Sequence, residues 1–147
     1  MHRFYSLSSV GVLLVAVSVL AIPAHTSAGE RPHSSRGTAQ FLPDATGDFV
    51  GSGYATHLGN YTEVGNASIS PIGEIEGWAH YTAGNGNGHT LFATFTGQVD
   101  AFGAITVTVT YVGGTGQFEN ASGSATLLGQ IQLDGTIVVA VEGTIDY

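Results

Sequence analysis

Two carboxylates, an indole and an imidazole alternate along one short segment and are the residues best suited to chemistry. They are Glu74, Glu76, Trp78 and His80. In a β-strand, side chains two residues apart project from the same face. Carboxylates and an imidazole on one face are able to carry out acid–base catalysis or to ligate a divalent cation. Glu74, Glu76 and His80 are therefore the candidate catalytic residues.

The same alternation supports a second and stronger interpretation, in which this charged face is solvated. The opposite face is smaller and more apolar, as the interior of a β-barrel is. That face contains Ile75, Gly77, Ala79 and Tyr81. If the strand belongs to a barrel, small side chains on the inner face leave room for a ligand in the lumen. The predicted ligand-binding residues are Gly77, Ala79, Tyr81, Ala93 and Phe95.

Other chemistry has little support in the sequence. There is no cysteine, and His57, His80 and His89 do not have the spacing of a metal site. The segment Gly114-Thr-Gly116 lacks the third glycine and the following helix of a nucleotide-binding loop. We therefore predict no metal and no cofactor. His57, in Ala-Thr-His-Leu-Gly, is predicted to be a hydrogen-bonded structural residue at one end of the fold.

The first 28 residues have the features of an export signal. A short basic start is followed by an apolar run from Val10 to Ile22, and Thr26-Ser-Ala28 is an acceptable cleavage site. The apolar run is shorter than the roughly 20 residues that a spanning helix needs, although an uncleaved anchor is the alternative. The sequence thus predicts a secreted or periplasmic protein without stable membrane insertion after cleavage. Residues 29–37 are predicted to be a flexible linker before one domain at 38–147.

The charge balance restricts the partners of the mature protein. Removing Met1 to Ala28 leaves Arg31 and Arg36 against 11 acids, a formal charge of −9. Nucleic acids and anionic membranes attract clustered Lys and Arg, which this chain lacks. We therefore predict no nucleic-acid partner. Because both arginines lie in the predicted linker, the folded domain is expected to contain no fixed positive charge.

Apolar residues recur with a period of two throughout the domain, which predicts an all-β fold. The predicted strands are 38–42, 49–58, 61–69, 74–83, 89–99, 104–112, 123–133 and 136–146. In the clearest of them, Ile105, Val107, Val109 and Tyr111 alternate with threonines. Short turns, such as Asp134-Gly135, indicate a meander. Closing eight strands into an antiparallel up-and-down barrel removes both free edges, so we favour it over a two-sheet sandwich.

One glycine-rich loop carries a family resemblance. The segment Gly113-Gly-Thr-Gly-Gln-Phe-Glu-Asn-Ala-Ser-Gly123 surrounds a single aromatic anchor, Phe118. It resembles a segment of the dirigent and allene oxide cyclase-like barrels, and the chain is most similar to secreted bacterial proteins of that type. Gly53-Tyr-Ala-Thr-His-Leu-Gly59, Ala83-Gly-Asn-Gly86 and Glu142-Gly-Thr-Ile-Asp-Tyr147 strengthen the likeness. The structural motif residues are His57, Gly113, Gly114, Gly116, Phe118 and Gly123.

The resemblance implies an eight-stranded barrel and a homo-oligomer, often a trimer, but it transfers no catalytic residue. Three hypotheses for function follow. The leading one is a barrel that holds a small apolar molecule in its lumen. The second is a structural or interaction module of the cell envelope. The third is a cyclase-type enzyme, which requires Glu74 or Glu76 to point inward.

Overall fold

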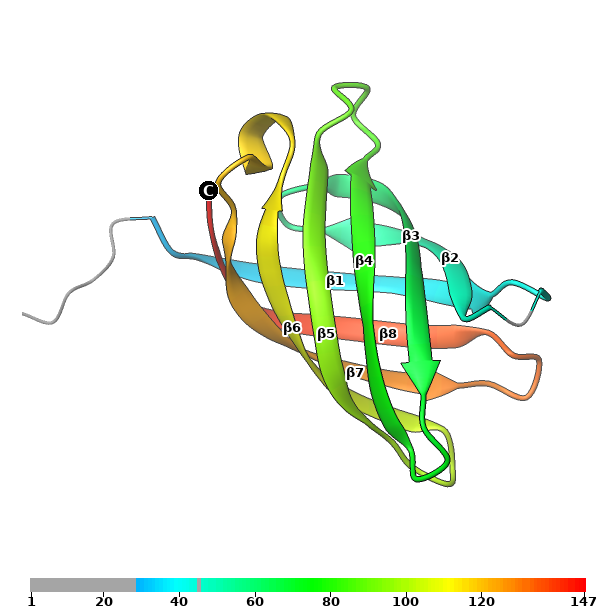
Figure 1. The fold of residues 1–147 in the computed structure, drawn as a ribbon. Coiled ribbons are helices and arrows are strands. Elements are labelled where there is room, and N and C mark those ends of the chain that lie inside the picture. The colour runs from blue at the N-terminus through cyan, green and yellow to red at the C-terminus, as the bar shows by residue number, and fades with distance from the viewer. Residues whose placement is uncertain (1–28, 45) are drawn as a thin grey trace, which may run out of the picture.

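The protein is an all-β barrel. The computed structural model describes residues 29–44 and 46–147, so the predicted signal peptide lies outside the described residues. Eight antiparallel strands follow one another in chain order and close on themselves, as Figure 1 shows. They are β1 (Arg31–Phe41), β2 (Asp48–Ala55), β3 (Gly59–Ile69), β4 (Glu74–Ala83), β5 (Thr90–Val99), β6 (Ala104–Gly114), β7 (Ser122–Ile131) and β8 (Ile137–Asp146). The up-and-down barrel is confirmed, and the alternative two-sheet sandwich is wrong.

The first strand is longer than predicted, and the linker prediction is wrong for residues 31–37. Strand β1 begins at Arg31 and pairs with β8 from Arg31↔Ile145 to Ala39↔Ile137. The sequence of the first half of β1 does not show an alternation of apolar and polar residues, because its inward residues, His33 and Ser35, are polar yet buried. Arg31 and Arg36 therefore belong to the barrel, with both side chains exposed. The expectation of a domain without fixed positive charge is also wrong.

The barrel has two different ends. One end carries the turns that join β1 to β2, β3 to β4, β5 to β6 and β7 to β8, and we call it the mouth. In Figure 1 these turns lie along the right and lower sides. The opposite end carries the β2–β3 turn, the β4–β5 loop, the β6–β7 loop and the last residue, Tyr147. We call it the plugged end.

The β6–β7 loop fills the plugged end with an aromatic side chain. Its single 3-10 turn (Gly116–Phe118) places Phe118 in the interior, where it is 0% exposed and packs on Tyr147 with ring centroids 4.9 Å apart. Gly113, Gly116 and Gly123 have positive φ angles of 109°, 60° and 130°. At Gly116 a Cβ would also collide with the ring of His89. The glycines shape the loop, and the phenylalanine closes the barrel beneath it.

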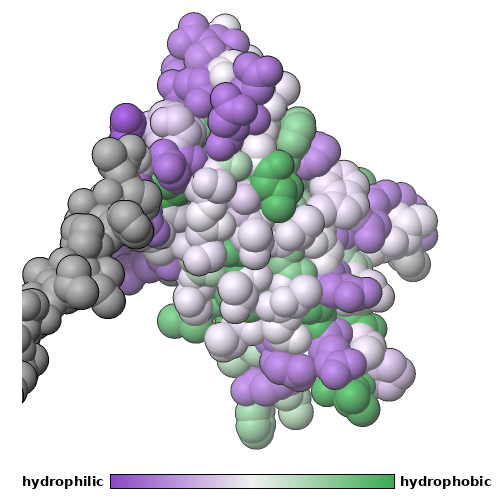
Figure 2. Space-filling view, turned by 60° about the vertical axis from the view of Figure 1, so that its left-hand side comes forward, coloured by the Kyte–Doolittle hydropathy of each residue, from purple (hydrophilic) through white to green (hydrophobic). Residues whose placement is uncertain are grey.

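Inward and outward positions alternate along every strand, and the outer wall is weakly polar. The outward threonines of β6 (Thr106, Thr108 and Thr110) are exposed, whereas Val107 and Val109 are buried. Much of the wall in Figure 2 is pale, the colour of residues of intermediate hydropathy. Among the described residues, no helix has the length and apolar character needed to cross a membrane.

Replacing Phe118 with alanine tests the plug. Deleting a fully buried aromatic ring leaves a cavity, so the free energy of unfolding should fall by about 3–5 kcal/mol. Urea denaturation measures this change. The matched control is Phe102→Ala in the β5–β6 turn, where the side chain is 87% exposed and the expected change is within about 0.5 kcal/mol. Equal losses for the two variants would contradict the assigned role of Phe118.

Candidate functional site

The lumen contains a cavity between the middle of the barrel and the mouth. Its volume is about 70 Å³. Its lining residues are Ser35, Ala39, Phe41, Phe49, Tyr61, Glu63, Ala67, Ile75, Tyr81, Phe95, Ile105, Val107, Leu127, Ile137, Val139 and Val141. Phe41 is the last residue of β1 and Ile137 the first of β8, so the cavity reaches the mouth. Nearly all of this lining is aliphatic or aromatic.

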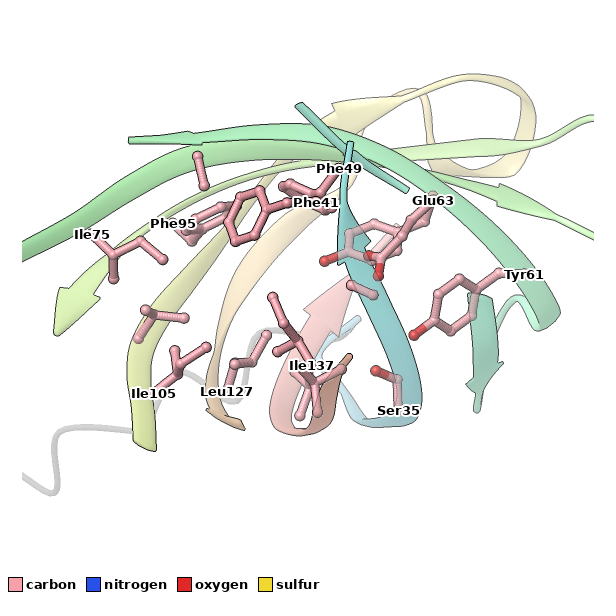
Figure 3. Close-up of a pocket in the computed structure, with 16 residues that line it drawn as sticks. Ser35, Phe41, Phe49, Tyr61, Glu63, Ile75, Phe95, Ile105, Leu127 and Ile137 are labelled. Carbon is pink, nitrogen blue, oxygen red and sulfur yellow. The ribbon is translucent and has the colours of Figure 1, made fainter. Parts of the chain in front are cut away.

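One carboxylic acid lies in this apolar lining. Glu63, in the first half of β3, is only 6% exposed. Burial raises the pKa of its carboxyl from 4.5 to about 7. This happens because a low-dielectric environment disfavours the charged form. Figure 3 shows Glu63, Tyr61 and Ser35 at one end of the pocket, with Ile75, Phe95 and Ile105 toward the other.

The position of Glu63 follows from the register of three neighbouring strands. Glu63 pairs with Gly51 on β2 and with Tyr81 on β4. A Cβ at Gly51 would overlap the Glu63 carboxyl, so the missing side chain makes the space that the carboxyl occupies. A glycine on the neighbouring strand thus leaves the space that a large inward side chain such as Glu63 needs.

Two tyrosines flank the acid. The rings of Tyr61 and Tyr81 meet edge to face with centroids 5.4 Å apart. Burial and the neighbouring Glu63 raise the pKa of Tyr61 to about 12, although a hydrogen bond with Ser35 acts in the opposite direction. Burial, followed by Glu63, also raises the pKa of Tyr81. Both hydroxyls are therefore neutral at physiological pH and remain available for hydrogen bonding.

Between this polar group and the plug lies a second, nearly filled compartment of about 10 Å³. His33 lines it and is 5% exposed, and its Nδ1 has no hydrogen-bond partner among the described residues. Burial, with a smaller contribution from His57, lowers the pKa of His33 to about 4. The ring stacks on His57 at 5.7 Å and meets the edge of Tyr111 at 5.2 Å. His33 is thus a neutral aromatic ring in the core.

His57 joins both chain ends of the barrel at the plugged end. Its Nε2 donates to the carbonyl of Pro32 at 2.8 Å, so its Nδ1 is free to accept from the Tyr147 hydroxyl at 3.2 Å. Arg31 donates to the same hydroxyl at 3.2 Å and lies 4.8 Å above the Tyr147 ring. The network therefore links the start of β1 to the last residue through the β2–β3 turn.

The candidate catalytic residues on β4 lie outside the barrel. Glu74 and Glu76 are exposed, and His80 is half-buried between the rings of Trp78 and Phe92 on the outer wall. None of the three lines the lumen cavity. A cyclase-type enzyme built on an inward Glu74 or Glu76 does not fit this arrangement.

Only some of the predicted ligand-binding residues line the cavity. Tyr81 and Phe95 line the cavity, whereas Gly77, Ala79 and Ala93 do not. The space next to Gly77 is occupied by the ring of Phe95, and Ala79 and Ala93 face each other across β4 and β5 at 1% and 2% exposure. The space beside these small inward residues is therefore filled by neighbouring side chains and is not available to a ligand.

The sequence reasoning missed Glu63, Tyr61, Ser35 and His33. A signal for Glu63 was present, because the period of two places it on one face of β3 with Tyr61, Gly65 and Ala67. The signal for Ser35 and His33 was weaker, since polar residues near a predicted linker resemble a solvated segment. Among the described residues, no group of three or more His, Cys, Asp or Glu side chains is placed to hold a metal ion.

Fold and site together define an eight-stranded antiparallel barrel with a one-acid apolar lumen. No family model matches this chain, and comparisons with curated proteins and with solved structures also find no match.

Glu63 should make the stability of the protein depend on pH. Because its pKa rises on folding from 4.5 to about 7, the folded state binds more protons than the unfolded state across that range. Its contribution to the free energy of unfolding is therefore fully present below pH 4.5 and is lost as the pH rises through 7. Relative to the wild type, Glu63→Gln should gain on the order of 3 kcal/mol between about pH 4.5 and 8.

Urea denaturation at a series of pH values measures this difference. Subtracting the wild-type free energy of unfolding at each pH removes the contribution of His33. That contribution has the opposite pH dependence and is the same in both proteins. Glu76→Gln is the control, since Glu76 is exposed on the outer wall of the same barrel and the change leaves the lumen untouched. A flat difference for Glu63→Gln would show that this carboxyl is solvated.

Proposed function

We propose that this barrel holds a small apolar molecule in its lumen. The observation that supports the proposal is the unfilled volume of about 70 Å³ between Glu63 and the mouth, in a lining that is almost wholly apolar. Interiors built only for stability are packed to the density of organic crystals. Here one end is packed in that way, around Phe118, and the other end has a cavity.

The proposal includes an extracytoplasmic location, after removal of residues 1–28, and a relationship to the dirigent and allene oxide cyclase-like barrels. The leader features and the Gly113–Gly123 loop support these two parts. An eight-stranded barrel has an interior suited either to packed side chains or to one small ligand, which agrees with a carrier of modest capacity.

A cyclase-type enzyme is the second candidate, and Glu63 is the observation that favours it. Its carboxyl is inside the lumen and has a pKa of about 7, the range in which a general acid or base works best at neutral pH. In this version Glu63 takes the place that the sequence assigned to Glu74 or Glu76.

An interaction module of the cell envelope, including a homo-oligomer, draws its support from the outer wall. Val50 and Val64 face each other across β2 and β3, at 41% and 51% exposure. Trp78 on β4 is 42% exposed. Apolar side chains gathered on one wall are typical of protein contact surfaces.

Filling the cavity should abolish binding while the barrel remains folded. Ala39 lines the cavity near the mouth, and Ala39→Leu places three additional carbons inside it. We expect the affinity for 1-octanol, a neutral apolar probe, to fall at least tenfold. Isothermal titration calorimetry measures the affinity, and urea denaturation checks that the variant is folded.

The matched control is Ala140→Leu, which makes the same change at an exposed position of β8 on the outer wall. It should bind 1-octanol as the wild type does. If Ala39→Leu is folded and binds normally, or if the wild type binds neither 1-octanol nor any other eight-carbon apolar probe, the lumen proposal is wrong.

A further inference from the structure

Among the residues that the structure describes, no positively charged side chain lies beside the carboxyl of Glu63 in the lumen. The chain's cationic residues are Arg3, Arg31 and Arg36. Arg31 lies on Tyr147 at the plugged end, and Arg36 is exposed on the outer wall. No hydrogen bond to the Glu63 carboxyl occurs among the described side chains. A buried carboxylate without a countercharge is costly, so a ligand that supplies the positive charge gains affinity there.

The groups around Glu63 are those that recognise ammonium ions. Tyr61 and Tyr81 present their rings beside the carboxyl, and the faces of aromatic rings attract cations. Their hydroxyls and that of Ser35 are neutral and can accept hydrogen bonds from an N–H group. The acid, the two aromatic rings and the hydroxyls line the same end of the pocket, and these are the group types that bind a primary amine.

The cavity beyond Glu63 is small. On β3 its lining runs from Glu63 to Ala67, which is about 13 Å along the strand and about 10 Å along the barrel axis. Its volume of about 70 Å³ is well below the several hundred Å³ of typical sites for drug-sized ligands. Such a volume holds an amino group and the first few carbons of a linear chain, and the rest of the chain would lie at the mouth.

The mouth itself carries both apolar and negative groups. Its turns expose Leu42, Ile72, Phe102 and Leu133 at 38%, 77%, 87% and 111%. Each apolar residue has an acid close in sequence, and the acids are Asp44, Glu74, Asp100 and Asp134. None of these turns contains Lys or Arg. Figure 2 shows hydrophobic and hydrophilic residues side by side at the lower edge of the molecule.

A rim of this composition attracts a particular class of molecule. The carboxylates draw cations toward the opening and repel anions, while the apolar side chains contact an alkyl chain as it enters. Fatty acids, the commonest apolar chains with a charged end, are disfavoured at the rim and again at Glu63. The mouth and the interior therefore select for the same charge.

From these contacts we infer that the lumen is selective for a linear alkylamine, whose ammonium group lies at Glu63 between Tyr61 and Tyr81 and whose chain extends to the mouth. The inference rests on the proposed lumen-binding function and gives its ligand class. Binding places a positive charge next to the carboxyl, which favours its ionised form, and any proton that the carboxyl still carries passes to solvent.

Three probes of equal chain length test the inference: n-octylamine, 1-octanol and octanoate, each titrated calorimetrically into the wild type at about pH 8. At this pH an alkylamine is protonated, as a lysine side chain is. We expect octylammonium to bind at least tenfold more tightly than 1-octanol, and octanoate to bind at least tenfold more weakly. Glu63→Gln should lose at least tenfold in affinity for octylammonium and less than threefold for 1-octanol. Glu76→Gln, on the outer wall, should behave as the wild type.

The results separate the two proposals. If 1-octanol binds but octylammonium shows no advantage, or if its advantage survives in Glu63→Gln, the amine inference is wrong and the lumen proposal stands. If octanoate binds most tightly, the charge selectivity is the reverse of the one inferred. If neither octylammonium nor 1-octanol binds, both proposals are wrong.

Discussion

The pairing of β1 with β8 is the constraint on which the whole molecule depends. Nine residue pairs, from Arg31↔Ile145 to Ala39↔Ile137, join the first strand to the last. They leave no free sheet edge among the described strands and convert a meander into an enclosed lumen. Only inside such an enclosure does a carboxyl on β3 lose most of its contact with water, as Glu63 does at 6% exposure. The unusual environment of Glu63 is thus a consequence of strand pairing far from it in sequence.

The sizes of neighbouring side chains on adjacent strands then determine which part of the lumen is filled and which part is a cavity. Gly51 makes space for Glu63, and Gly77 makes space for the ring of Phe95. Phe118 and Tyr111 complete the packing toward the plugged end, at 0% and 4% exposure. Toward the mouth, the large apolar side chains of three turns, Ile72, Phe102 and Leu133, are exposed instead of buried in the lumen. The cavity therefore remains there, with its polar group at the inner end.

Much of this fold could be predicted from the sequence, because strand period and turn chemistry are local. The predicted bounds of β4, about 74–83, agree with the structure, and the solvated face of Glu74 and Glu76 follows from simple alternation. The start of β1 could not be found in this way, since His33 and Ser35 are polar residues in the core. The site was harder still. Whether an inward alanine such as Ala93 faces empty space depends on register and on the size of its neighbours, which no single strand reveals.

The proposed binding in the lumen depends on a Glu63 carboxyl that lies in apolar surroundings and can take a positive charge beside it. Carbon-13 NMR of the side-chain carboxyls, with Glu63 assigned through Glu63→Gln, measures this directly as a titration of one group. We expect a midpoint at about pH 7 in the free protein, which moves lower on saturation with octylammonium. A midpoint near the ordinary value of 4.5, unchanged by the amine, would contradict this expectation.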